Sequence, residues 1–296
     1  MVMSSRWTAL SASVEGASHL HIGLVNQDAV RLKNPSGADD ALLLAVADGH
    51  GSTRSFRSER GSAMAAECAV REMGRFVRRL GPNAPLSQVR NQAKTIWPRT
   101  LLKAWKHAVR ADLVTTPFTL FDFAPFPEPP PVVKPDEELP ISAYLAYGAT
   151  LLAVAITPRY IIYSQLGDGD IITVATDGSV SRPLPRHHEF MANQTVSLCS
   201  YHAFEEFQIR VDPLRGAMPA LVILSTDGYA NCFGDDESFY RVGVDFLSYI
   251  RSKGVDYVQA KLEEWLRQSS HDGSGDDTTV GLAARINAFP FSARSD

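Results

Sequence analysis

The chain has 296 residues, 45% of them hydrophobic, and a formal net charge of −4 from 29 Lys and Arg against 33 Asp and Glu. This near balance excludes a strongly basic nucleic-acid surface or polybasic membrane patch, so we expect neither partner. Three widely spaced cysteines (Cys68, Cys199 and Cys232) indicate reduced thiols in a cytoplasmic protein, not a disulfide framework or a zinc site. No signal peptide is evident, and no apolar run approaches the roughly 18 residues that span a bilayer.

Apolar runs of strand length cover 42–47, 150–156, 160–166, 170–175, 221–225 and 278–284. Helical periodicity covers 55–79, 86–110, 238–250 and 255–268, with Ser87 as a candidate cap and an interruption or bend at Pro98. Tight turns at 157–159 and 167–169 predict that the strands between 150 and 176 pair as antiparallel neighbours. The element order predicts an α+β fold with helices grouped against antiparallel sheets.

Residues 117–140 contain eight prolines and cannot form a regular element. We interpret them as an exposed, polyproline-like insertion between a helix and a strand, with a docking segment for a partner as the alternative. The flanking strands belong to one sheet system, so this segment is not predicted to be a domain boundary.

Aspartates stand at the ends of the apolar strands: Asp48 after LLLAVA, Asp168 after YIIYSQLG, Asp227 after LVILST, Asp276 and Asp277 before TTVGLAA, and Asp28 further upstream. Each alone could be a turn residue, because Asp-Gly is a common turn dipeptide. Gathered at one end of a core, however, unpaired carboxylates repel each other, and a divalent cation removes that cost. Carboxylates without cysteine favour hard ions, and Mg²⁺ and Mn²⁺ fit best. Two such ions sharing a carboxylate suit the hydrolysis of phosphate esters.

The segment after the first strand, Asp48-Gly49-His50-Gly51, combines a carboxylate, an imidazole and two glycines. The glycines let the backbone approach a metal closely. An imidazole held between them can protonate a departing alkoxide near pH 7.

In order along the chain, VNQDA (25–29), VADGHGS (46–52), YGATLLAVAI (147–156), LGDGDIITV (166–174), LSTDGYANCF (224–233) and GDDTTVGLA (275–283) resemble the metal-dependent type 2C serine/threonine protein phosphatases, in a divergent bacterial-type branch. The resemblance runs from about residue 14 to 286. It implies one domain over 1–296, built as a four-layer α/β/β/α sandwich of two antiparallel sheets flanked by helix pairs, with the Pro-rich insertion added.

The resemblance also implies roles. Asp48 corresponds to the bridging metal ligand, Gly49 to the carbonyl ligand, and Asp227 and Asp276 to the remaining carboxylate ligands of two Mn²⁺ or Mg²⁺ ions. His50 corresponds to the general acid. The residues expected to act on the metals through water or other side chains are Gln27, Asp28, Asp168 and Asp277.

This sequence departs from the family pattern at four positions. Gln27 replaces a glutamate, which should weaken one metal site. Gly23 replaces an arginine that grips substrate phosphate; His19, His21, Arg54 and Arg57 are the candidate substitutes for it. Leu145 replaces a third-metal aspartate, and Asp277 replaces an asparagine.

The sequence therefore predicts a phosphoprotein phosphatase in which a hydroxide bridging two metals attacks phosphoserine or phosphothreonine directly. Its partners would be a phosphorylated protein substrate and, in the same signalling system, a serine/threonine kinase or that kinase's targets. The alternative is a catalytically inactive scaffold or phosphoprotein-binding module with the same fold, which Gln27, Gly23 and the Pro-rich insertion would favour.

Overall fold

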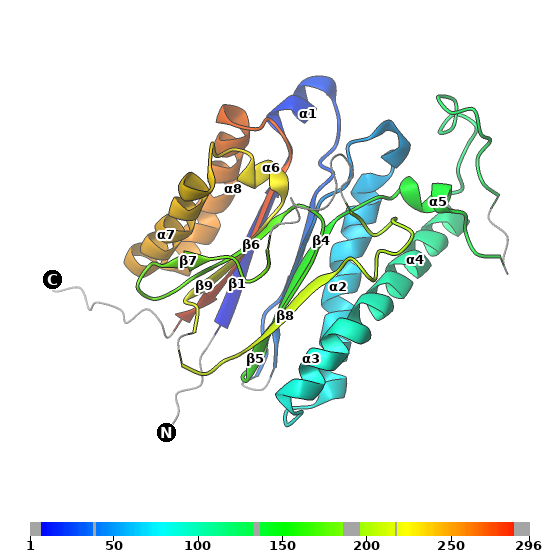
Figure 1. The fold of residues 1–296 in the computed structure, drawn as a ribbon. Coiled ribbons are helices and arrows are strands. Elements are labelled where there is room, and N and C mark those ends of the chain that lie inside the picture. Colours follow the sequence, from blue (N-terminus) through cyan, green and yellow to red (C-terminus); the bar gives the residue numbers. More distant parts are fainter. Residues whose placement is uncertain (1–6, 38–39, 133–136, 186–195, 217, 287–296) are drawn as a thin grey trace.

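The computed structural model describes residues 7–37, 40–132, 137–185, 196–216 and 218–286. Within them, two five-stranded sheets lie face to face, and helices cover the outer face of each sheet (Figure 1). All pairings between the strands of each sheet are antiparallel. The predicted α+β, four-layer α/β/β/α sandwich is confirmed.

The first sheet has the order β1 (Trp7–Val14), β10 (Thr278–Arg285), β9 (Leu221–Ser225), β6 (Asp170–Val174), β7 (Val180–Ser181). The second has the order β2 (Ala29–Lys33), β3 (Leu42–Ala47), β4 (Leu151–Ile156), β5 (Tyr160–Leu166), β8 (Gln208–Pro213). The first sheet is covered by α7 (Asp236–Lys253) and α8 (Val255–Asp272), and the second by α2 (Ser58–Leu80), α3 (Leu86–Thr95) and α4 (Trp97–Thr115). Four short elements complete the described chain: α1 (Ala17–Ile22), η1 (Thr53–Ser55), α5 (Ile141–Leu145) and α6 (Asp227–Ala230).

The strand LLLAVA is apolar throughout because both of its faces are buried. Leu43 and Ala45 belong to the core beneath α2 and α4, whereas Leu42 and Leu44 belong to the core between the two sheets. Successive side chains of a strand point to opposite faces, so a strand packed on both sides needs no polar alternation. Because β3 is packed on both faces, the backbone position of Asp48, the residue that follows the strand, is fixed.

The expected pairing of all strands between 150 and 176 is correct for β4 with β5 and wrong for β5 with β6. At the turn Gly167-Asp168-Gly169 the chain crosses from the second sheet to the first, where β6 pairs with β9. Gly167 has a φ of 107°, and a Cβ at Gly169 would lie 2.8 Å from the carbonyl oxygen of Ser225. This left-handed, closely packed turn aims β6 at the other sheet instead of folding it back.

The helix expected over 86–110 is two helices that meet at Ile96. Pro98 lies in the first turn of α4, where its missing N–H is tolerated, so the break precedes the proline. The expectation that Ser87 caps the first helix is wrong, because the N-cap is Pro85. The four edge strands β1, β2, β7 and β8 and the short helices α1, α5 and α6 were not predicted from periodicity.

The Pro-rich insertion lies between α4 and α5, and its residues 133–136 fall outside the described part of the chain. Its described residues form neither helix nor strand, as expected. It is only partly exposed, however, because Phe123 is buried and packs edge-on against Phe56 and Phe118. The insertion is therefore docked on the segment that follows the DGHG turn.

Among the described residues, no helix has both the length and the apolar character needed to cross a membrane.

Candidate functional site

The six aspartates singled out in the sequence lie at one end of the two sheets. Asp48 follows β3, Asp28 precedes β2, Asp168 lies in the β5–β6 turn, Asp227 begins α6 after β9, and Asp276 and Asp277 precede β10. Because neighbouring strands are antiparallel, the end of one strand and the start of the next meet at the same edge. The fold thus gathers carboxylates that are up to 249 residues apart in the chain.

The side chains of Asp48, Asp227 and Asp28 are close enough to influence each other's ionisation. Burial raises the pKa of Asp48 well above its usual value, and the negative charges of Asp28 and Asp227 raise it further. Burial, followed by the charges of Asp168 and Asp276, likewise raises the pKa of Asp227. These carboxylates resist losing their protons in the metal-free protein, because each new charge is poorly solvated and meets others of the same sign.

Gly49 lies where the DGHG turn and the NQD segment touch. Its N–H donates to the carbonyl oxygen of Gln27 at 3.1 Å. A Cβ at this position would lie 2.6 Å from that oxygen and 2.7 Å from the carbonyl oxygen of Ser58. Only glycine fits between these two backbone segments, so close packing alone already accounts for this residue.

His50 is half-buried beside the GAT segment. Its N–H donates to the carbonyl oxygen of Gly148 at 3.1 Å, and a Cβ on Gly148 would lie 2.5 Å from the ring carbon Cδ2 of His50. Burial lowers the pKa of His50, while the charges of Asp168 and Asp227 oppose that shift. Gly148 is therefore a residue of the candidate site that the sequence reasoning did not single out; the GAT motif was its signal.

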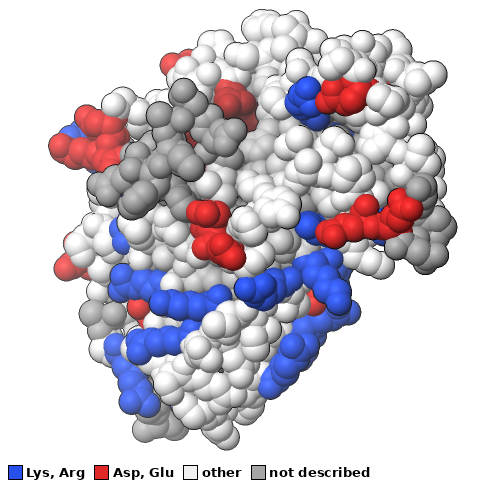
Figure 2. Space-filling model, turned by 45° about the vertical axis from the view of Figure 1, so that its right-hand side comes forward, with Lys and Arg blue, Asp and Glu red and all other residues white. Residues whose placement is uncertain are grey.

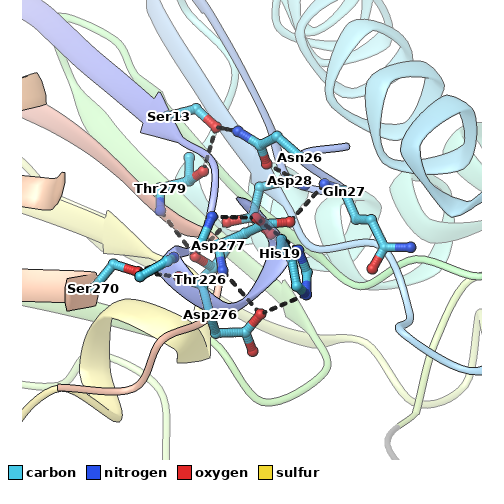
Figure 3. Close-up of polar contacts among 12 residues, drawn as sticks. Ser13, His19, Asn26, Gln27, Asp28, Thr226, Ser270, Asp276, Asp277 and Thr279 are labelled. Atoms are coloured by element: carbon cyan, nitrogen blue, oxygen red, sulfur yellow. Dashed lines mark hydrogen bonds and ion pairs between the residues drawn. The ribbon is translucent and has the colours of Figure 1, made fainter. Parts of the chain in front are cut away.

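Asp277 ties three segments of the site together (Figure 3). Its Oδ1 accepts a hydrogen bond from the N–H of Gly16 at 2.7 Å, and its Oδ2 accepts one from the N–H of Gln27 at 2.6 Å. Its own N–H donates to Oδ1 of Asp276 at 2.8 Å. In an asparagine one of these two oxygens would be an NH₂ group, which only donates, so the backbone N–H facing it would lose its acceptor. This double acceptance explains why the chain has an aspartate here.

Asp28 is held by the hydroxyl group of Thr226, which is itself fixed by the backbone of Thr279 (Figure 3). Its Oδ2 accepts from the hydroxyl of Thr226 at 2.8 Å, and that hydroxyl oxygen accepts from the N–H of Thr279. Burial raises the pKa of Asp28 well above its usual value; these threonine contacts act in the opposite direction, and the charges of Asp277 and Asp227 add to the rise. Thr226, in the STDG motif, thus positions Asp28 and was not predicted to do so.

His19 lies on α1 between the last two aspartates. Its Nε2 is 3.6 Å from Oδ1 of Asp276, and its Nδ1 is 3.0 Å from Oδ1 of Asp277. The ring is only 15% exposed, whereas His21, two residues further along α1, is exposed. The structure therefore separates the two histidines that the sequence offered as phosphate contacts: one faces the carboxylates and the other faces outward.

The structure also shows where the three other residues that depart from the family pattern lie. Gly23 ends α1 with a φ of 70°, and a Cβ there would meet nothing within 4 Å. Leu145 ends α5 and packs against the core beneath the second sheet. The side-chain amide of Gln27 points away from Asp277 (Figure 3), and its Oε1 lies 3.7 Å from the place of a Cβ on Gly51.

The two arginines after the DGHG turn both contact the Pro-rich insertion. Arg54 pairs with Glu128 at 2.7 Å between Nη1 and Oε1, and its guanidinium lies over the ring of Phe126. Arg57 is 7% exposed and donates to the carbonyl oxygen of Thr116 and the hydroxyl of Tyr147. Arg54, one of the candidate substitutes for the phosphate-binding arginine, is thus paired with a carboxylate of the chain itself.

Basic side chains gather on another part of the surface. Figure 2 shows Lys and Arg concentrated on the side of the molecule that α3 and α4 form. On α4 they recur on one face, as Arg99, Lys103, Lys106 and Arg110, around a groove that includes none of the candidate site residues. The net charge of −4 is thus unevenly distributed, and these cations do not replace the missing arginine.

Comparisons with known proteins agree with this geometry. A family model described as protein phosphatase 2C matches residues 15–267. The serine/threonine phosphatase Stp1 from Staphylococcus aureus is 14% identical, with a TM-score of 0.56 over 96% of this chain and 97% of that one. The S. agalactiae serine/threonine phosphatase is 16% identical, with a TM-score of 0.53 over 94% and 99% of the two chains. The catalytic domain of the serine threonine protein phosphatase PstP, in complex with two manganese ions, is 16% identical, with a TM-score of 0.51 over 94% and 97%.

No curated protein matches the chain in sequence. At 14–16% identity the structural matches establish the fold alone. The family model, in contrast, covers most of the chain. The chain therefore belongs to the protein phosphatase 2C family, whose enzyme class is protein serine/threonine phosphatase.

Proposed function

We propose that the protein is a metal-dependent phosphatase that hydrolyses phosphoserine or phosphothreonine in proteins, with Asp48, Asp227 and Asp276 as its metal-binding carboxylates. The observation that carries this proposal is the crowding of these half-buried or exposed carboxylates at one sheet edge, with burial and mutual charge raising the pKa of the first two. Oxygen donors alone, without cysteine, suit two Mn²⁺ or Mg²⁺ ions. When bound, the ions supply a nucleophilic hydroxide and neutralise phosphate charge.

The remaining roles belong to side chains of the chain. Asp48, at the end of the rigid strand β3, would bridge the ions, and the carbonyl group of Gly49 would be a further ligand. Asp28, fixed by Thr226, would accept a proton from water at its carboxylate oxygen. His50, packed against Gly148, would donate a proton to the serine or threonine oxygen as the phosphate bond breaks.

Asp168 and Asp277 would not bind the ions directly but would act on the residues that do. Asp168 contributes charge that acts on both Asp227 and His50. Asp277 holds the backbone of Gln27 and Gly16 in place through its two oxygens. The Gln27 side chain, which has no charge, would contact an ion only through water.

The substrate is a phosphorylated protein, and we propose that the enzyme opposes a serine/threonine kinase. Arg54 would contact substrate phosphate only after leaving Glu128, since the two are paired. We propose that the whole chain forms one catalytic domain, with the Pro-rich insertion docked beside the entrance to the site.

The test is a phosphate-release assay with a phosphothreonine peptide, in Mn²⁺ or Mg²⁺ and then in chelator. We expect turnover with the metals, none in chelator, and its loss in Asp227→Asn. The matched control is Asp245→Asn, an exposed carboxylate on α7 outside the site, which should retain activity. Equal inactivity of the wild type and Asp227→Asn at every Mn²⁺ concentration would instead support the inactive scaffold.

A further inference from the structure

The short helix α1 is fastened to the loop that carries Asp276 and Asp277. The N–H of Gly16 donates to Asp277, the N–H of Ala17 donates to the hydroxyl of Ser270, and the N–H of Ser18 donates to the carbonyl oxygen of Gly275. Three consecutive backbone donors therefore fix the start of α1 on this loop and on the last turn of α8. The position of the next residue, His19, is set by the backbone and not by its own side chain.

The imidazole of His19 lies beside two carboxylates but forms no hydrogen bond with either of them. Its Nδ1 is fully buried and lies 3.0 Å from Oδ1 of Asp277, yet the geometry is not that of a hydrogen bond and the atom has no other partner. Its Nε2 is 3.6 Å from Oδ1 of Asp276, too far for a hydrogen bond. Buried ring nitrogens normally have a partner, so this orientation lacks an explanation within the protein alone.

The same three side chains form a compact donor set. One nitrogen of His19 and one oxygen each from Asp276 and Asp277 all lie within 4.8 Å of one another, in the part of the chain that the structure describes. Two ligands of one ion, with bonds of about 2.1 Å, are about 3.0 Å apart in octahedral and about 3.4 Å apart in tetrahedral geometry. The 3.0 Å between Nδ1 of His19 and Oδ1 of Asp277 lies in that range, the 3.6 Å between Nε2 and Oδ1 of Asp276 is slightly longer, and one ion can bind only one of the two nitrogens. Asp276 is half-exposed, so an ion could reach the cluster from solvent.

We propose that His19, Asp276 and Asp277 hold a divalent transition-metal ion at the outer edge of the carboxylate centre, with Asp276 shared between this ion and the centre. The proposal rests on the proposed function only through that shared residue. Imidazole suits Zn²⁺, Fe²⁺ and Ni²⁺ best, and Mn²⁺ accepts it more readily than Mg²⁺ does, because Mg²⁺ strongly prefers oxygen. The nitrogen donor therefore makes this position selective for transition metals over Mg²⁺. It also adds a metal ligand in a chain that lacks the charges expected at Gln27 and Leu145.

The experiment measures metal binding directly, by calorimetric titration of the full chain with Mn²⁺ and separately with Mg²⁺. We expect His19→Ala to lose one equivalent of Mn²⁺, or about tenfold or more in its affinity, with Mg²⁺ binding unchanged. His21→Ala is the matched control, because this histidine lies on the same helix but is exposed. It should bind both metals as the wild type does.

A third variant separates the new site from the proposed centre. Asp48→Asn should weaken the centre but keep the Mn²⁺ equivalent that depends on His19. Unchanged Mn²⁺ binding by His19→Ala overturns the proposal. If that variant binds Mn²⁺ normally but is less stable than the wild type in chelator, His19 is only a counter-ion of the two aspartates. If the wild type binds Mn²⁺ that His19→Ala loses but hydrolyses no phosphopeptide, the proposed function fails and the site stands. Thermal unfolding in chelator checks that each variant is folded.

Discussion

The carboxylate of Asp277 accepts a hydrogen bond from the N–H of Gln27 at 2.6 Å, across 250 residues of sequence. Its other oxygen accepts from the N–H of Gly16, so one buried side chain positions both the NQD segment and the start of α1. The candidate site is thus assembled by backbone contacts to a carboxylate and not only by the strands.

Asp277→Asn should therefore destabilise the protein. An amide can accept only one of the two hydrogen bonds, and a buried N–H left without an acceptor costs about 1–3 kcal/mol. Urea unfolding in chelator measures the change without contributions from bound metal. Asp245→Asn, an exposed change of the same chemistry, should shift the midpoint very little; equal midpoints for the two variants would contradict the assigned role of Asp277.

The sequence predicted the layered fold and the gathering of aspartates at one end of the sheets because both depend on local sequence patterns. LLLAVA followed by Asp48 identifies a strand buried on both faces, and the Asp-Gly pairs after other apolar runs repeat that signal. It did not predict that β6 joins the opposite sheet. Strand length and turn length are the same in both arrangements, and only the left-handed Gly167 and its packing decide between them.

The contacts of His19 could not be read from the sequence for another reason. The sequence offers this histidine as a candidate contact for substrate phosphate, but its carboxylate neighbours Asp276 and Asp277 are more than 250 residues away in the chain. Their meeting depends on α1, which is too short for its periodicity to be recognised. Side-chain pairs that depend on such a helix require the tertiary structure.

The carboxylate cluster predicts an unusual dependence of stability on pH in chelator. Burial raises the pKa of Asp48 above the ordinary value near 3.9, so the folded state holds its proton more tightly than the unfolded state does. The contribution of this group to stability then falls as pH rises from about 4 through the raised folded-state pKa. We expect the free energy of unfolding of the wild type to decrease over this range relative to that of Asp48→Asn.

Mn²⁺ should reverse this trend, since ions bind the deprotonated carboxylates and stabilise the folded state more as pH rises. Urea midpoints at several pH values, with chelator and with Mn²⁺, measure both effects. A constant difference between the wild type and Asp48→Asn in chelator would show that Asp48 is not perturbed in the metal-free protein.

The contact between Gly148 and His50 predicts a selective loss of activity. A methyl group on Gly148 would lie 2.5 Å from the ring of His50 and displace it. Loss of a general acid slows the release of a threonine alkoxide by about 10²–10⁴-fold, but it matters less for a phenolate, which leaves without a proton. Gly148→Ala and His50→Ala should both lose turnover of a phosphothreonine peptide and retain most of their turnover of an aryl phosphate.

Gly234→Ala is the matched control, because a Cβ at that position meets nothing within 4 Å. It should hydrolyse both substrates at the rate of the wild type. If His50→Ala slows the two substrates equally, His50 is not the acid that protonates the leaving group.

The two arginines near the insertion should differ sharply in their contribution to stability. Arg57 is buried, donates to the carbonyl oxygens of Thr116 and Pro117 and to the hydroxyl of Tyr147, and lies over the ring of Phe118. Its replacement by alanine leaves buried polar groups unpaired, and we expect a loss of about 3–5 kcal/mol. Urea unfolding of Arg57→Ala in chelator measures that loss.

Arg54→Ala is the comparison, because the Arg54–Glu128 pair is about half-exposed and exposed pairs contribute about 0–1 kcal/mol. Its unfolding midpoint should stay close to that of the wild type. Since Arg54 is held by Glu128 and not by the core, Glu128→Gln should instead change the apparent KM for a phosphopeptide by freeing the guanidinium. A large loss of stability in Arg54→Ala, or an unchanged midpoint in Arg57→Ala, would show that the insertion is anchored by other contacts.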